Sequence, residues 1–198
     1  MEPRAIRSAC DDISGTGDLL EKALKLAGLV TTLFDERGFR LVVVGGAAVE
    51  FYTEGAYMSG DVDLCREGAR PIPPRLEQQT MAALGASGGP RSWLTLGVYV
   101  DLLGGLENEA RTPIRELQTP NGVVRLVPPE LLLVERVLCA VYPAADAGAD
   151  LCARKLLSAC VSGKVAVDWK EVERLARSRS YNVADALARM RREVTDAG

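Results

Sequence analysis

The chain has 198 residues, 47% hydrophobic and 26% charged, and its 24 basic and 27 acidic residues give a net charge of −3. These values are typical of a globular protein with a sizeable core, and they give no sign of a strongly basic nucleic-acid binder. The sequence contains no apolar run of the about 18 residues that a membrane span needs, and no secretory signal, so we expect a cytoplasmic protein.

The absence of histidine narrows the chemistry further. The chain has no His, and its five cysteines include no Cys-x-x-Cys pair. A zinc site and a Ser-His or Cys-His nucleophile are therefore disfavoured. Any catalysis has to use carboxylates, Lys, Arg, Ser or Tyr, or a hard metal ion bound through oxygen.

The first half of the chain predicts alternating helices and strands. Apolar residues recur at helical spacing over 18–37, and "FRLVVVGG" at 39–46 is typical of a short buried strand. A short helix follows the glycine pair, and "DVDLCR" at 61–66 predicts the next strand. Prolines then open a helix over 71–86.

The second half predicts more strands and then only helices. One or two strands are expected over 92–105, and Asn121-Gly122 between apolar arms predicts a hairpin. Pro128-Pro129 marks a boundary, after which four segments have helical spacing. We therefore predict an α+β fold with a mixed sheet over residues 1–127, followed by a small helical region over 128–198.

Three aspartates in predicted strands suggest a metal site. Asp61 and Asp63 share one face of their strand, since side chains alternate, while Val62 faces the other layer. Two carboxylates about 6–7 Å apart at Cα repel each other unless a cation lies between them. Asp101, inside the apolar strand "VYVDLL", is the candidate third acid. Such a set suits Mg²⁺ and phosphoryl or nucleotidyl transfer.

The glycine pair is the candidate phosphate contact. Gly45 and Gly46 follow an apolar strand, so their backbone N–H groups can approach a phosphate closely, and Ser59 can add a hydroxyl. Each motif alone has a simpler explanation: a tight turn for the glycines and a solvated strand for the aspartates. The ordered combination is more specific than its parts.

That combination resembles the nucleotidyltransferase superfamily related to DNA polymerase β. The family pattern is a Gly-Gly or Gly-Ser turn after a strand, then an Asp-x-Asp strand, then an acid on a separate strand. Gly45-Gly46, Asp61-Val62-Asp63 and Asp101 match it, and Ser59 matches the small hydroxyl residue ahead of the acids. The likeness covers about 39–140 and is greatest to small bacterial and archaeal members, including domains associated with toxin–antitoxin modules.

The resemblance implies a nucleotidyltransferase-like core over 1–127 and metal-dependent transfer of a nucleoside monophosphate from an NTP such as ATP. Asp61, Asp63 and Asp101 would be catalytic metal ligands for Mg²⁺ or Mn²⁺. Gly45, Gly46 and Ser59 would bind the nucleotide. The acceptor (RNA, protein or a small molecule) is not readable from these residues.

One departure leaves an alternative open. Similar proteins carry a Lys in the helix that begins with a Pro-Glu pair, here Pro129-Glu130, whereas this chain has Arg136 in that helix. Lys155 is a more distant substitute for that Lys. The simpler interpretation is that Arg136 is a solvated helix residue. The alternative function is a catalytically inactive binding module, for example a toxin–antitoxin component, working through a protein partner or as a homo-oligomer.

Overall fold

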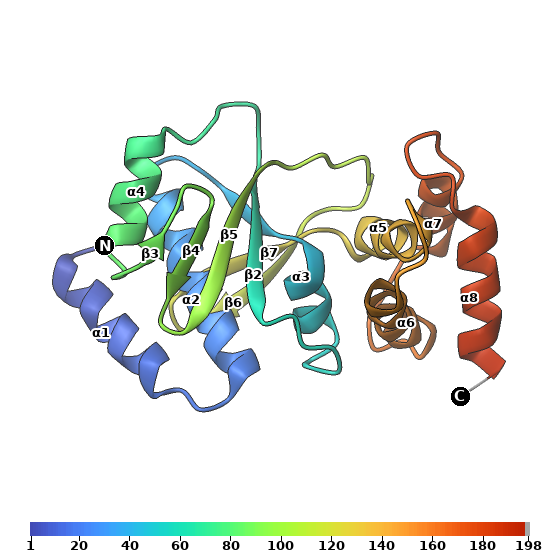
Figure 1. The fold of residues 1–198 in the computed structure, drawn as a ribbon, viewed down its shortest axis with the longest axis horizontal. Coiled ribbons are helices and arrows are strands. Elements are labelled where there is room, and N and C mark those ends of the chain that lie inside the picture. Colours follow the sequence, from blue (N-terminus) through green and yellow to red (C-terminus); the bar gives the residue numbers. More distant parts are fainter. Residues whose placement is uncertain (197–198) are drawn as a thin grey trace. The chain divides into compact units, whose positions relative to one another are not determined.

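The computed structural model describes residues 1–196, and their contacts divide the chain into two units (Figure 1). Unit 1 comprises Met1–Ala47, Met58–Glu107 and Glu116–Leu126. Unit 2 comprises Ala48–Tyr57, Asn108–Arg115 and the chain from Val127 onward.

Unit 1 is built on a mixed sheet in the order β3-β4-β5-β2-β1-β7-β6. The strands are β1 (Leu41–Val43), β2 (Asp61–Arg66), β3 (Ser87–Gly88), β4 (Ser92–Thr95), β5 (Val98–Gly105), β6 (Arg115–Thr119) and β7 (Gly122–Leu126). The pairs β2–β5 and β1–β7 are parallel, whereas β1–β2, β3–β4 and β4–β5 are antiparallel. The predicted α+β class with a mixed sheet is confirmed.

The helices that begin in unit 1 are α1 (Pro3–Gly15), α2 (Leu19–Asp35), α3 (Gly45–Tyr52) and α4 (Pro74–Ala82). The spacing that predicted a helix over 18–37 corresponds to α2, whose N-cap carboxylate, Asp18, accepts a hydrogen bond from the Glu21 N–H. Helix α1 was not predicted, because only Ile6 and Ile13 of its residues are buried. Helix α3 continues into unit 2.

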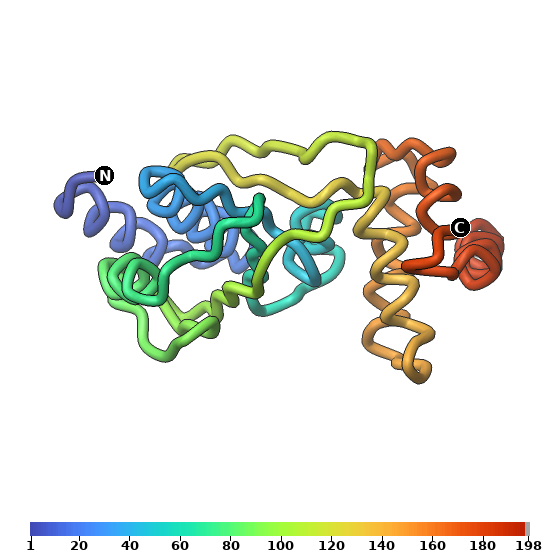
Figure 2. The backbone as a smooth tube through the Cα atoms, turned by 90° about the horizontal axis from the view of Figure 1, so that it is seen from above, coloured from blue at the N-terminus to red at the C-terminus, as the bar shows by residue number. Residues whose placement is uncertain are grey.

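Helix α2 packs beside the β6–β7 hairpin, as Figure 2 shows. The hairpin predicted at Asn121-Gly122 is confirmed, with Pro120 and Asn121 forming the turn. The Thr31 hydroxyl donates to the Val123 carbonyl at 2.8 Å, and the Thr32 hydroxyl donates to the Asn121 carbonyl at 3.0 Å. Through these bonds the two threonine hydroxyls of α2 donate to one carbonyl group of β7 and one of the hairpin turn.

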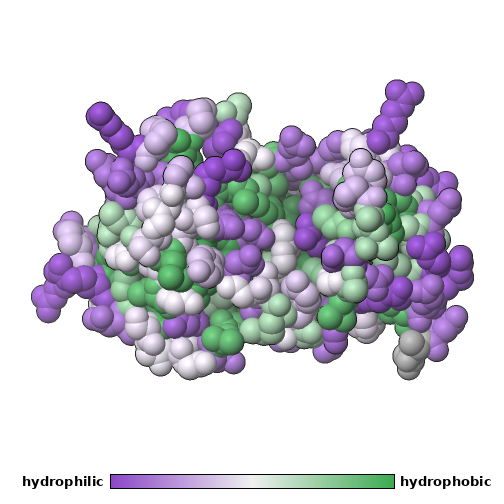
Figure 3. All heavy atoms as spheres, viewed as in Figure 1, coloured by the Kyte–Doolittle hydropathy of each residue, from purple (hydrophilic) through white to green (hydrophobic). Residues whose placement is uncertain are grey.

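Unit 2 is mainly helical. Its later helices are α5 (Pro129–Val141), α6 (Ala147–Val161), α7 (Trp169–Ala176) and α8 (Ala184–Asp196). Their buried residues include Leu133, Leu157, Leu175 and Met190. Hydrophilic side chains cover much of the visible surface over α8 (Figure 3).

Two buried glutamates tie the segment Asn108–Arg115 to these helices. Glu130 accepts hydrogen bonds from the Thr112 hydroxyl at 2.8 Å and the Asp168 N–H at 2.9 Å. Glu171 accepts from the Arg111 N–H at 2.7 Å and from two guanidinium nitrogens of Arg174. Each buried carboxylate is therefore compensated by donors within its own unit.

None of the helices in the described part of the chain has both the length and the apolar character needed to cross a bilayer.

We predict that Gly122→Ala destabilises the fold. Gly122 has φ 138°, and a Cβ there would lie 1.9 Å from Thr32 Oγ1 and 2.9 Å from the Gly28 carbonyl oxygen. The clash with a backbone atom and the disfavoured φ should lower the free energy of unfolding by about 2 kcal/mol or more, measured by urea denaturation. The control Gly15→Ala, where a Cβ meets nothing within 4 Å, should be near neutral; equal effects of both substitutions would contradict the packing argument.

We also predict a pH dependence of stability from Glu171. Hydrogen bonds from Arg174 lower the pKa of this carboxyl to about 2 from an ordinary 4.5. Its stabilising effect is therefore complete above about pH 4.5 and is lost as the pH falls toward 2. Thermal unfolding of Glu171→Gln should give a lower Tm than wild type at pH 7 and a converging Tm near pH 2. The exposed neighbour Glu173 provides the control, and Glu173→Gln should change Tm little at either pH.

Candidate active site

Strand β2 presents two acids on one side and apolar residues on the other. Val62 is fully buried and Leu64 nearly so, whereas Asp61 and Asp63 are half-buried. Burial of the apolar face fixes the strand's register, because a shift by one residue would turn the aspartates into the core. The expectation that Asp61 and Asp63 share a face is confirmed.

The third acid, Asp101, lies on the neighbouring strand β5 and faces the same side of the sheet as Asp61 and Asp63. Strands β2 and β5 pair in parallel with Asp63 opposite Asp101 and Val62 opposite Val100. Asp101 therefore projects on the same side as Asp63, while Val100 joins Val62 in the core. The expectation that Asp101 sits on a separate, adjacent strand is confirmed.

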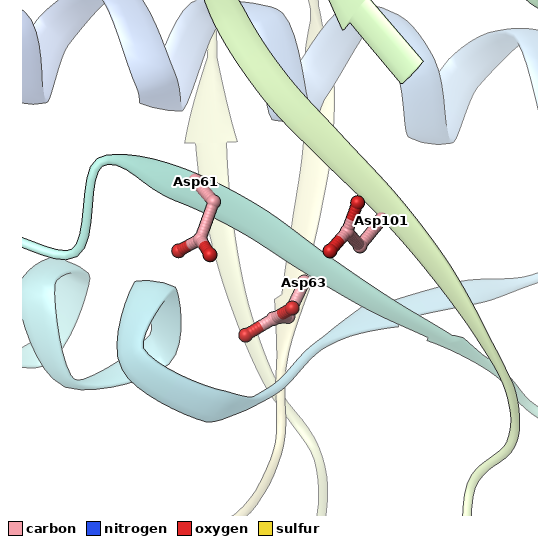
Figure 4. Close-up of side chains that lie close together, drawn as sticks. All are labelled: Asp61, Asp63 and Asp101. Atoms are coloured by element: carbon pink, nitrogen blue, oxygen red, sulfur yellow. The ribbon is translucent and has the colours of Figure 1, made fainter. Parts of the chain in front are cut away.

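The three carboxylates converge, as Figure 4 shows. Asp61, Asp63 and Asp101 each offer one oxygen, and these atoms lie within 4.8 Å of one another. Asp101 Oδ1 is buried and has no hydrogen-bond partner among the described residues. A buried carboxylate oxygen without a donor is costly, and a cation in this position would compensate it. The all-oxygen donor set fits a hard divalent ion such as Mg²⁺ or Mn²⁺.

Gly45 allows the Asp63 carboxylate to lie against the start of α3. A Cβ built on Gly45 would be 2.2 Å from Asp63 Oδ2, and the residue has φ 65°. The Val44 N–H also donates to the Asp63 carbonyl at 3.0 Å, which holds the end of β1 against β2. The glycine is thus required both for its backbone conformation and for the close approach of a candidate metal ligand. Gly46 is the next residue of the same helix.

Ser59 contacts one of the acids directly. Its hydroxyl donates a short hydrogen bond to Asp61 Oδ1. This bond orients the Asp61 carboxylate and leaves its other oxygen for a second interaction.

The two candidate basic residues belong to unit 2. Arg136 lies on α5, half-buried, and its Nε is buried without a hydrogen-bond partner in the described part of the chain. It neighbours Cys152, whose thiol pKa is raised by burial. Lys155 is exposed on α6. Arg136 is therefore not the freely solvated helix residue of the simpler interpretation.

Comparison with known proteins bears on the fold. No family model matches the chain, and no curated protein sequence matches it either. Among solved structures, an antigenic nucleotidyltransferase-like protein from Paracoccidioides brasiliensis is similar, with a TM-score of 0.54 and 16% identity over 87% of this chain and 94% of that one.

Two structures of the antibiotic-resistance factor ANT(2'')-Ia are less similar. One, determined in solution, has a TM-score of 0.47 and 18% identity over 83% of this chain and 93% of that one. The other, a crystal structure with adenylyl-2''-tobramycin, has a TM-score of 0.37 and 14% identity over 85% of this chain and 94% of that one. The likeness to the Paracoccidioides protein shows that this chain has the nucleotidyltransferase-like fold that its sequence motifs predict.

Proposed function

We propose that this protein is a metal-dependent nucleotidyltransferase that moves a nucleoside monophosphate from an NTP to an acceptor hydroxyl. The observation that carries the proposal is the convergence of Asp61, Asp63 and Asp101, with one Asp101 oxygen buried and unpartnered. Three carboxylates at this separation repel one another, and a bound cation would compensate that repulsion.

The reaction forms a bond between the acceptor oxygen and the α-phosphorus of the NTP. The bond from that phosphorus to the oxygen bridging the β-phosphate breaks, and pyrophosphate leaves. Mg²⁺ held by Asp61, Asp63 and Asp101 would neutralise charge on the phosphates. Asp101 is the residue we assign to receive the acceptor hydroxyl's proton, since a carboxylate beside the reacting oxygen can act as a general base.

The nucleotide contacts are proposed from the surroundings of the acids. The backbone N–H groups of Gly45 and Gly46 would bind phosphate oxygens at the start of α3. Ser59 would hold Asp61 in place and offer a hydroxyl contact to the same phosphates. Arg136 is proposed from the family resemblance alone as the guanidinium for the triphosphate, since planar donors suit phosphate oxygens.

Label transfer tests the reaction. Wild-type protein incubated with Mg²⁺, α-labelled NTPs and fractions of RNA, protein or small molecules should label one fraction. Asp61→Asn/Asp63→Asn should lower the rate by about 1000-fold or more, because a bound metal contributes several kcal/mol to such transfers. The exposed Asp11 serves as control, and Asp11→Asn should retain activity.

Failure of transfer would have a specific meaning. If folded wild-type protein labels nothing with any NTP, the catalytic proposal is contradicted and the non-catalytic binding module becomes the better hypothesis.

Metal binding is testable without turnover. Saturating Mg²⁺ or Mn²⁺ should stabilise the wild-type protein by about 2–3 kcal/mol at a concentration about 100 times Kd. Asp101→Asn should abolish that gain and, without metal, should be no less stable than wild type, because it removes a like charge. Glu107→Gln, an exposed acid just beyond β5, is the matched control and should keep the full gain. Calorimetric unfolding with and without metal measures both effects.

A further inference from the structure

A small hollow in unit 1, lined mainly by apolar residues but also by two arginines, lies on the opposite side of the sheet from the acids. It has a volume of about 150 Å³ and is lined in part by Leu64, Leu102, Pro71, Ile72, Arg66 and Arg91. Leu64 and Leu102 each follow one of the acids by one residue along β2 and β5. Since side chains alternate along a strand, these leucines face away from Asp63 and Asp101. The hollow is therefore distinct from the candidate active site.

A β-bulge in β5 positions the side chain of Arg91. Leu64 pairs with Leu102, but the next residue, Cys65, pairs with Gly104, so Leu103 is an extra residue in β5. The Leu103 carbonyl accepts a hydrogen bond from Arg91 Nη2 at 3.1 Å. The bulge thus leaves the Leu103 carbonyl outside the strand pairing, where it accepts the hydrogen bond from the Arg91 guanidinium.

The backbone of Arg91 is also held. Arg91 has φ 77°, an unfavourable value for a residue with a side chain. Its N–H donates to Glu77 Oε1 at 2.9 Å, and the Trp93 indole N–H donates to the same oxygen at 2.9 Å. Glu77, a carboxylate in the wall of the hollow, is therefore engaged by neutral donors.

Arg66 contributes an unsatisfied donor. Its Nη2 donates to the Ala69 carbonyl at 3.1 Å, whereas its Nε is buried and has no hydrogen-bond partner within residues 1–196. In that part of the chain neither Arg66 nor Arg91 forms a salt bridge. Two guanidinium groups thus line one hollow, each tethered by a carbonyl group and neither neutralised by a carboxylate.

We propose that this hollow is a binding site for a small phosphate-type oxyanion. The two guanidinium groups outnumber the one carboxylate of the wall, Glu77, so the lining carries a net positive charge that an anion would neutralise, and guanidinium N–H groups would donate to it. Guanidinium donors match the oxygen spacing of phosphate, and tethering reduces the entropy lost on binding. The volume suits a group of a few heavy atoms and not a whole nucleotide. Inorganic phosphate and pyrophosphate share this chemistry.

The site is tested by isothermal titration calorimetry of the full chain with phosphate and with pyrophosphate. The titrations are done in EDTA, with chloride at equal ionic strength as the reference anion. Saturable binding is expected for wild type. Arg66→Gln should weaken it roughly tenfold or more, because charged hydrogen bonds are lost. The exposed Arg75 of α4 lies outside the hollow, so Arg75→Gln is the matched control and should bind like wild type.

A second variant keeps the proposal testable if Arg66→Gln fails to fold. Arg91→Gln keeps the backbone bond to Glu77 and should also weaken binding, with circular dichroism reporting whether each variant is folded. Saturable binding of either anion that both folded variants weaken would support the proposal. Absence of saturable binding to wild type, or equal binding to wild type and to both folded variants, would overturn the proposal.

The outcome is independent of the proposed catalytic activity. The same titration on Asp61→Asn/Asp63→Asn should give wild-type affinity, because those carboxylates lie on the other face of the sheet. If transfer fails while phosphate binding depends on Arg66, the enzyme proposal is contradicted and this site stands. If the double-aspartate variant binds the anion with a different affinity from wild type, the anion binds beside the acids and the separate site is refuted.

Discussion

The parallel pairing of β2 with β5 is the contact on which the candidate site depends, because it places Asp63 opposite Asp101. Like charges directly opposite each other on neighbouring strands destabilise the pairing. The same pairing buries Val62 and Val100 completely on the other face, and each such side chain contributes roughly 1.5–3 kcal/mol. Apolar burial thus fixes the strand register that keeps the acids together, and a bound cation would relieve their repulsion.

The surroundings of the acids limit how that repulsion can be relieved. Asp61 receives the Ser59 hydroxyl, and Asp63 lies against Gly45, where any Cβ would collide with its carboxylate. Asp101 retains a buried oxygen without a donor among the described residues. The side chains cannot all turn away, since their strands are fixed by apolar burial on the opposite face. A divalent ion is the compensation that this geometry best accommodates.

Sequence patterns predicted those features that depend on local alternation. The β2 strand, the shared face of Asp61 and Asp63 and helix α2 all follow from periodicity and side-chain alternation. Helix α1 was missed because its two buried isoleucines, Ile6 and Ile13, give little periodic signal. The bulge at Leu103 was also missed, because one extra residue in β5 becomes visible only once its pairing with β2 is known.

The acids of this protein that are buried wholly or in part differ in the groups that they face. Glu130 and Glu171 are saturated by hydroxyl, backbone or guanidinium donors from their own unit. Nothing further is needed to make their burial stable, and for Glu171 the donors also lower the pKa. Asp101 instead faces two other carboxylates and has an oxygen that receives no donor from residues 1–196. Arg66 shows the converse, a buried donor without an acceptor in the same range. Because few buried polar atoms in folded proteins stay unpaired, a cation beside Asp101 and an anion beside Arg66 would each compensate a group that the fold leaves incomplete.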